Sequence, residues 1–171
     1  MRGSVRTFVW AALCLASCTV HHERKAEGGV LDLRGRDWSE PLALDGQWRF
    51  YWQEFIDPSL PFEEGPAIEV PGKWNDYRTQ NGLAGGRGYA TYRLKILLGQ
   101  SPPLALRILH FDTTYAVFVN GRLLHSEGKP GKTEGESKPD RRPIVLDLPL
   151  DESLDLVIHV ERRDDGRCEV G

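Results

Sequence analysis

Short segments in which apolar and polar residues alternate recur along most of the chain. The clearest spans residues 89–98. Its two faces differ in chemistry, with Tyr92, Leu94, Ile96 and Leu98 on one and Thr91, Arg93 and Lys95 on the other. A period of two residues indicates a β-strand with one buried face and one solvated face.

The same pattern predicts further strands at Val30–Leu33, Gln47–Trp52, Ala67–Val70, 104–108, Tyr115–Val119, Arg122–His125, 144–148 and 154–160. No stretch with helical periodicity exceeds about two turns. The pattern therefore predicts an all-β domain. The residues expected to be buried in it are Trp48, Phe50, Tyr92, Leu94, Ile96, Val117, Val119, Leu156 and Ile158.

Glycine, proline and asparagine mark the connections between these strands. Asn120-Gly121 predicts a type I′ hairpin turn, because both residues tolerate positive φ. Asp45-Gly46 predicts a second hairpin, in which residues 41–44 pair with the next strand. Pro71 cannot donate a ladder hydrogen bond, so it is expected to end the strand before it. Residues 54–66 are expected to be a loop.

Composition agrees with one soluble domain. The 171 residues suffice for one core but not for two comfortable domains. A hydrophobic content of 40% and a charged content of 27% are ordinary, and 11 Pro and 18 Gly favour short strands joined by turns. The formal net charge of −3 offers no basic footprint. Nucleic acid is therefore not expected as a partner.

The N-terminal residues look like an export signal. Arg2 and Arg6 precede the apolar segment Phe8–Ala16, which is shorter than the about 20 residues that span a bilayer. Residues 15–18, Leu-Ala-Ser-Cys, resemble a bacterial lipobox, in which Cys18 is diacylated and becomes the new N-terminus. The alternative is an ordinary signal peptide that happens to contain this cysteine.

These features predict three parts: a lipoprotein signal peptide (residues 1–17), a polar flexible tether (18–28) and a β-sandwich domain (29–171). The expected location is the bacterial cell envelope. There the chain is lipid-anchored to a membrane and faces the periplasm or the exterior.

Cysteines and histidines form no recognisable metal or disulfide set. Cys14 lies in the signal peptide and Cys18 in the lipobox, so Cys168 has no partner for an internal disulfide. His21 and His22 are neighbours whose side chains point apart, with no third ligand nearby. No metal site and no cofactor are expected.

The loop before residue 89 gathers groups suited to a ligand. Its Gly-rich part, 82–88, permits positive φ and close approach. The candidate ligand-binding residues are Trp74, Asn75, Tyr77, Arg87 and Tyr89. Aromatic faces stack on the C–H patches of sugars, and amide and guanidinium groups bond sugar hydroxyls. Trp74 is equally suited to plug one end of the sandwich, and the sequence leaves both roles open.

Four motifs occur in a fixed order: Asp45-Gly46-Gln47-Trp48-Arg49-Phe50-Tyr51, Val70-Pro71-Gly72-Lys73-Trp74, Tyr89-Ala90-Thr91-Tyr92-Arg93-Leu94 and Val117-Phe118-Val119-Asn120-Gly121. Their order and spacing resemble the galactose-binding-domain-like jelly-roll at the N-terminus of bacterial β-galactosidases and β-glucuronidases. They resemble still more the related ectodomain of bacterial seven-helix receptors with diverse intracellular signalling modules. The resemblance implies a jelly-roll β-sandwich of eight or nine strands. It implies no catalytic pair, because the jelly-roll of those glycosidases is not their catalytic domain.

The chain departs from these families near its end. A membrane or catalytic region follows in them, whereas this sequence stops at Gly171. The last strand of the domain would be Arg167–Val170, of which only two residues are apolar. Both a free-standing lipoprotein relative and a truncated remnant of a signalling receptor fit this pattern.

No nucleophile elbow, phosphate loop or His-Glu-x-x-His motif is present, so an enzyme is not expected. Two functions of different classes remain. One is a non-catalytic binding or sensor module for a carbohydrate or another small ligand. The other is a structural or protein-interaction domain with an envelope protein as its partner. A concave apolar site would favour the first, and a flat charged face the second.

Overall fold

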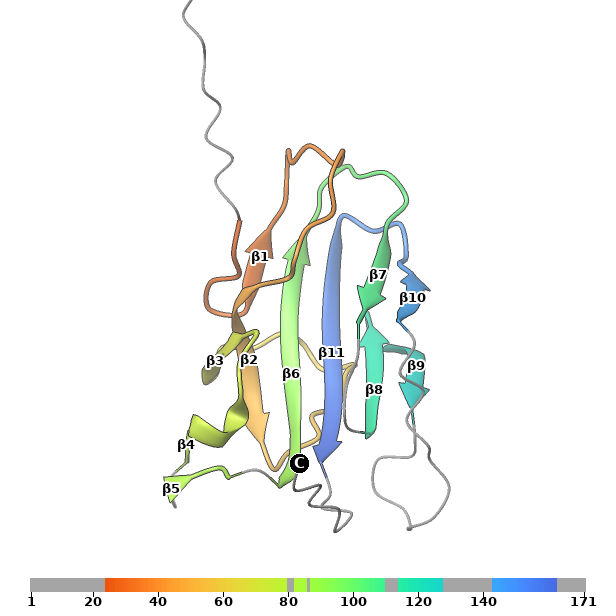
Figure 1. Ribbon diagram of the computed structural model, residues 1–171. Helices are drawn as coiled ribbons and strands as arrows, with labels where there is room; N and C mark the ends of the chain where they lie inside the picture. The colour runs from red at the N-terminus through yellow and green to blue at the C-terminus, as the bar shows by residue number, and fades with distance from the viewer. Residues whose placement is uncertain (1–23, 80–81, 86, 110–113, 128–142, 163–171) are drawn as a thin grey trace, which may run out of the picture.

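The computed structural model describes residues 24–79, 82–85, 87–109, 114–127 and 143–162 (Figure 1). The elements are β1 (Val30–Asp32), β2 (Gly46–Trp52), β3 (Ala67–Val70), the 3₁₀ turn η1 (Trp74–Asp76), β4 (Arg78–Thr79), β5 (Gly82–Leu83), β6 (Gly88–Leu97), β7 (Ala105–Ile108), β8 (Thr114–Val119), β9 (Arg122–Glu127), β10 (Ile144–Asp147) and β11 (Ser153–Arg162). The all-β prediction is confirmed. Cys18 and the candidate strand Arg167–Val170 lie outside the described residues.

One large sheet organises the domain. Its strand order is β3-β2-β6-β11-β8-β9, with antiparallel neighbours throughout. β11 occupies one edge of β6 along its whole length. On the other edge β2 pairs with residues 90–93 and β1 pairs, in parallel, with residues 95–97. β6 therefore lies at the centre, as expected for the segment with the clearest alternation.

A smaller layer packs on one face of this sheet. It consists of the antiparallel pair β7 and β10 and of residues 33–45, which cross the same face between β1 and β2 (Figure 1). Leu42 and Leu44 from the crossing segment, and Leu104, Leu106 and Leu148 from around the strand pair, pack against the core. Two layers enclosing one apolar core make a β-sandwich, the predicted fold class.

The predicted core residues lie between these layers. All nine except Tyr92 are buried, and Leu94, in the middle of β6, has no exposed surface. Tyr92 is half-buried, because its ring packs against Phe50 (centroids 4.9 Å apart) but is not enclosed on every side. Burial still raises the pKa of Tyr92 to about 12.

Two local predictions are confirmed and one is wrong. Asn120 and Gly121 have φ of 49° and 78°, as a type I′ turn requires, and β3 ends immediately before Pro71. Residues 41–44, however, form no strand. Both edges of β2 are already occupied at Gly46, by β3 on one side and by Ala26 on the other.

Ala26 joins the sheet through two backbone hydrogen bonds. Its N–H donates to the Asp45 carbonyl at 2.7 Å, and its own carbonyl accepts the Gln47 N–H at 2.7 Å. Ala26 is also buried in the core cluster. The folded part therefore begins before residue 29, where the sequence placed the boundary between tether and domain.

The polar face of β6 was expected to be solvated, and this prediction is wrong for its middle. Thr91 and Arg93 are 0% and 2% exposed, because residues 54–62 cross over them. The Thr91 hydroxyl donates to the Glu54 carbonyl (2.7 Å) and accepts the Ile56 N–H (3.2 Å). Alternation identifies the two faces of a strand, but it does not show whether a loop covers the polar one.

Candidate functional site

We call residues 74–79, 82–85 and 87–89 the rim. The rim residues predicted to bind a ligand point to two different faces of the large sheet. At the start of β6, Gly88 and Ala90 face the core side, where a Cβ added to Gly88 would lie only 2.5 Å from the Trp52 ring. Tyr89 lies between them in the strand, so its side chain points to the opposite face.

Trp74 and Tyr77 lie on the core side. The Trp74 side chain is 6% exposed and meets Trp52 in a T-shaped contact, with centroids 5.2 Å apart. Tyr77 packs edge-on against Phe50 at 4.6 Å, and burial raises the pKa of Tyr77. Asn75, between them in the turn η1, is half-buried. This arrangement corresponds to the second role considered for Trp74, a plug at one end of the sandwich.

Tyr89 lies on the other face, in a separate aromatic cluster. Its ring centroid is 4.8 Å from that of Phe55, and each of the two residues is 37% exposed. Phe55 also stacks on the His159 imidazole (4.8 Å), which contacts Phe118 (4.9 Å). Arg87 is exposed just before Tyr89 in the chain. We call the pair Phe55 and Tyr89 the aromatic ledge.

His159, in β11, supports the aromatic ledge by stacking on the ring of Phe55. Its Nε2 lies 2.9 Å from the Ile56 carbonyl oxygen, and because a carbonyl only accepts, Nε2 carries the proton. Burial lowers the pKa of His159 below its usual 6.5, an effect that the Ile56 hydrogen bond opposes in part. The imidazole is therefore neutral at pH 7 and holds the start of the loop against β11.

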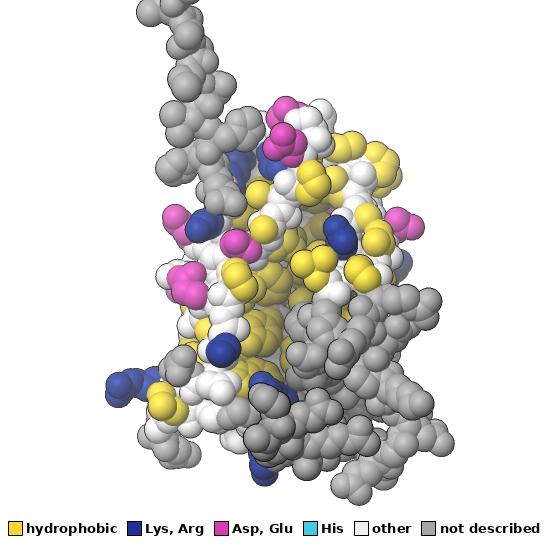
Figure 2. Space-filling view, in the orientation of Figure 1, with side chains coloured by type: hydrophobic (Ala, Val, Ile, Leu, Met, Phe, Trp, Pro, Cys, Tyr) yellow, Lys and Arg dark blue, Asp and Glu magenta, His cyan; other side chains and the backbone are white. Residues whose placement is uncertain are grey.

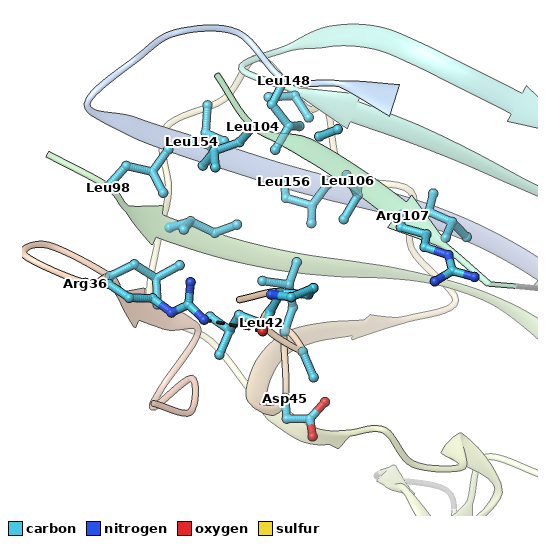
Figure 3. Close-up of a pocket in the computed structure, with 18 of the residues that line it drawn as sticks. Arg36, Leu42, Asp45, Leu98, Leu104, Leu106, Arg107, Leu148, Leu154 and Leu156 are labelled. Atoms are coloured by element: carbon cyan, nitrogen blue, oxygen red, sulfur yellow. Dashed lines mark hydrogen bonds between the residues drawn. The ribbon is translucent and has the colours of Figure 1, made fainter. Parts of the chain in front are cut away.

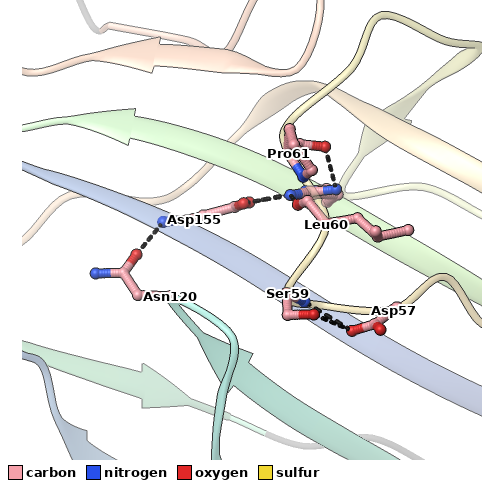
Figure 4. A network of polar contacts seen from close by, with 7 residues as sticks. Asp57, Ser59, Leu60, Pro61, Asn120 and Asp155 are labelled. Atoms are coloured by element: carbon pink, nitrogen blue, oxygen red, sulfur yellow. Dashed lines mark hydrogen bonds and ion pairs between the residues drawn. The ribbon is translucent and has the colours of Figure 1, made fainter.

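Arg93 holds the same loop further along the chain, at Leu60 and Pro61; Figure 4 shows these two residues together with Asp155 and Asn120. Its guanidinium pairs with the Asp155 carboxylate, with Nε 2.9 Å from Oδ1, and this pairing raises the pKa of Arg93. The two terminal nitrogens donate to the carbonyls of Pro61 (3.2 Å) and Leu60 (2.6 Å). Asn120 holds Asp155 in place by accepting its backbone N–H at 2.8 Å. The loop that carries Phe55 is thus attached to the sheet at both ends.

A separate concave feature lies on the core side. In the space-filling view, hydrophobic side chains line a hollow along the middle of this face (Figure 2). It is an apolar groove of about 650 Å³ between β7 and residues 36–45 (Figure 3). Its floor is formed by side chains of the large sheet, among them Trp48, Ile96, Leu98, Leu154, Leu156 and Ile158. Its charged lining residues are Arg36, Glu40, Asp45 and Arg107.

Sequence reasoning found neither the ledge partner Phe55 nor the apolar groove. Phe55 lies in the Pro- and Gly-punctuated segment 54–66, for which the sequence predicted a loop and no packing role. The signal that it packs on the sheet was the apolar content of that loop, with Phe55, Ile56, Leu60 and Phe62. The groove depends on where residues 36–45 cross the sheet, and their sequence does not specify this path.

Two absences hold for the part of the chain that the structure describes. It contains no group of three or more His, Cys, Asp or Glu side chains arranged to hold a metal ion. It also contains no helix that is long and apolar enough to cross a membrane.

No protein-family model matches the sequence, and no curated protein matches it. Solved structures do match. A β-glucuronidase from Faecalibacterium prausnitzii is similar at a TM-score of 0.55 and 24% identity, over 74% of this chain and 23% of that one. A β-glucuronidase from an uncultured Clostridium species has a TM-score of 0.52 and 19% identity, over 69% of this chain and 21% of that one. A β-glucuronidase from Bifidobacterium dentium has a TM-score of 0.52 and 21% identity, over 70% of this chain and 20% of that one.

This chain thus spans about a fifth of the length of these enzymes. At such identities the likeness is one of fold. It agrees with the resemblance to glycosidase jelly-rolls, whereas the resemblance to receptor ectodomains stays a prediction. The chain therefore has the β-sandwich fold of a domain-sized part of β-glucuronidases.

Proposed function

We propose that this chain is a non-catalytic carbohydrate-binding module of the cell envelope, held to a membrane through Cys18. The observation that carries the proposal is the aromatic ledge, a pair of half-open rings supported from below by His159. Partly exposed aromatic faces stack on the apolar faces of sugar rings. In this proposal Tyr89 and Phe55 stack on the ligand and Arg87 bonds its hydroxyl or carboxylate groups.

The comparisons support a carbohydrate as the first ligand class to test. The similar solved structures are β-glucuronidases, and the one from Bifidobacterium dentium is complexed with coumarin-3-O-glucuronide. A non-catalytic role is supported by the sequence, which has no recognisable catalytic motif, and by the small share of each enzyme that the chain matches. Asn75, Tyr77 and Trp74 belong to the same rim, and the proposal gives them a supporting role.

The test measures binding of mono- and oligosaccharides, uronic acids included, to the full chain by titration calorimetry or ligand-observed NMR. We expect dissociation constants near the millimolar range, about −4 kcal/mol, because a ledge buries little of its ligand. Tyr89→Ala should weaken binding at least tenfold. Leu83→Ala is the matched control, since Leu83 is 64% exposed in the same rim but outside the ledge. Binding that survives Tyr89→Ala would contradict the proposed site.

The proposed anchor has its own test. Cys18→Ser should abolish the incorporation of radiolabelled fatty acid and release the protein from membranes, because the lipobox cysteine is the only attachment point proposed. Unchanged membrane retention in this variant would count against a lipoprotein. The result is independent of carbohydrate binding.

A further inference from the structure

The apolar groove is lined by a cationic group, Arg36, of which one nitrogen has no hydrogen-bond partner. Arg36 Nη2 donates to the carbonyls of Glu40 (2.9 Å) and Pro41 (3.3 Å), and its guanidinium carbon lies 5.2 Å from the centre of the Trp38 ring. Arg36 Nη1, by contrast, is shielded from solvent and has no hydrogen-bond partner. Within the described ranges no carboxylate pairs with Arg36.

Such a group calls for an acceptor from outside the domain. A buried donor without a partner loses its hydration and gains nothing in return. In Figure 3 Arg36 lies at one end of the groove, next to Leu42 and towards Leu98. An anionic oxygen at this end would satisfy Nη1 and neutralise the guanidinium, in the strong geometry of a charge-assisted hydrogen bond.

Most of the other side chains that line the groove are aliphatic. Leucines from several segments that are distant in the chain line it, including Leu42, Leu104, Leu106, Leu148 and Leu156 (Figure 3). Its volume of about 650 Å³ falls within the range of small-molecule sites. A long apolar body with one anionic head matches both the lining and Arg36.

We propose that the apolar groove binds a free long-chain fatty acid, with the carboxylate on Arg36 and the acyl chain along the leucines. The site lies on the opposite face of the large sheet from the aromatic ledge. It is therefore independent of the carbohydrate proposal.

Two other occupants fit less well. A sugar needs polar partners along its whole length, and the lining offers polar side chains only at its four charged residues, at Ser39 and at Trp38. A peptide strand would pair with the edge of β7 away from β10. There the exposed residues Ala105 and Arg107 are open to water, so their backbone groups require no partner. The buried Arg36 Nη1 does require one, and it favours an anionic head.

The experiment uses the full chain with Cys18→Ser, purified without detergent, because detergents are themselves amphiphiles. A dansyl-labelled undecanoic acid is the probe, displaced by carboxylates of 8 to 16 carbons and by the matching alcohols. We expect affinity to rise about fourfold per CH₂ group. We also expect each carboxylate to bind at least tenfold more tightly than its alcohol.

Three variants separate charge from packing. Arg36→Met keeps the apolar stem and should remove the preference for carboxylate over alcohol while leaving alcohol binding unchanged. Arg34→Met is the matched control, because Arg34 is an exposed arginine two residues away that pairs with Asp32 outside the groove. Leu106→Trp should fill the groove and exclude both ligand series, with its melting curve recorded to check the fold.

Several results would overturn the proposal. One is that no fatty acid displaces the dansyl probe up to its solubility limit. Another is that the parent chain binds each acid and its matching alcohol equally tightly. A third is that Arg36→Met keeps the preference for carboxylate over alcohol. Displacement by extended peptides but not by fatty acids would assign the groove to a protein partner instead. Probe binding that disappears in the chain with Cys18 intact would assign it to the protein's own lipid.

Discussion

Trp74 closes one end of the sandwich, and its burial gives it a stability role that can be measured. We expect Trp74→Ala to cost about 3–5 kcal/mol, because a large ring packed on Trp52 leaves a cavity behind. In a domain of this size each kcal/mol of lost stability lowers the melting temperature by about 2–4 °C, so the melting temperature should fall by roughly 6–20 °C. Scanning calorimetry checks this.

Leu83→Ala is the control for this substitution as well. Leu83 lies in the same rim but is mostly exposed, so its loss should change the free energy of unfolding by less than about 0.5 kcal/mol. If Trp74→Ala melted at the parent temperature and lost carbohydrate binding, Trp74 would be a ligand-stacking residue after all.

The burial of Leu94 could be predicted from the sequence, and the burial of Arg93 could not. Alternation along β6 places Leu94 with its apolar neighbours, and the structure confirms it. Arg93 is polar, and the groups that make its burial favourable are Asp155, 62 residues away, and two carbonyls of the loop before β3. Nothing in the local pattern connects these groups.

At the scale of elements, the loop of residues 54–62 acts as a cover for the large sheet, held by the Arg93–Asp155 pair. We expect Asp155→Asn to destabilise the protein by about 3–5 kcal/mol, because it leaves a guanidinium buried without its counter-charge. Urea unfolding measures the loss. Hydrogen exchange at the Ile56 amide, which donates to Thr91 Oγ1, should report whether the loop opens before the sheet.

Asp32→Asn is the matched control for Asp155→Asn. The Asp32–Arg34 pair has the same chemistry, with Nη2 and Oδ2 2.5 Å apart, but both side chains are exposed. Exposed ion pairs contribute little to stability, because water and salt screen them. Equal effects of the two substitutions would show that burial of the Arg93 pair does not matter.

The two predicted hairpins had opposite outcomes for a reason that lies outside each turn. Asn120-Gly121 joins β8 and β9 because the edge of β8 away from β11 is free to pair. At Asp45-Gly46 the corresponding edge of β2 is taken by Ala26, a residue the sequence placed in the tether. Turn chemistry permits a hairpin, and the availability of strand edges decides whether it forms.

At the scale of the whole molecule, both candidate sites arise where covering segments meet the large sheet. The aromatic ledge needs residues 54–62 on one face, and the apolar groove needs residues 36–45 beside β7 on the other. Only Tyr89 and Arg87 of the ledge region were candidates from the sequence. Strand periodicity reports on a residue and its neighbours in the strand, whereas these sites combine segments that are distant in the chain.

The half-buried His159 should contribute to the pH dependence of global stability. Its pKa in the folded state lies below the usual 6.5 because burial disfavours the charged imidazole. Below about pH 6.5 the unfolded chain therefore binds a proton that the folded chain does not. By linkage, stability is full above this pH and falls as the pH decreases towards the folded pKa, by at most about 1.4 kcal/mol per pH unit.

His159→Gln provides the comparison, because glutamine can still donate to the Ile56 carbonyl but does not titrate in this range. Urea unfolding of both proteins between pH 7.5 and 5 should give a difference in stability that shrinks as the pH falls, with the parent losing more. The Asp32 carboxylate stays charged over this range, because its hydrogen bonds with Arg34 lower its pKa to about 2. Parallel pH profiles for the two proteins would mean that His159 is protonated as readily in the folded domain as in the unfolded chain. The imidazole under the aromatic ledge would then be open to water.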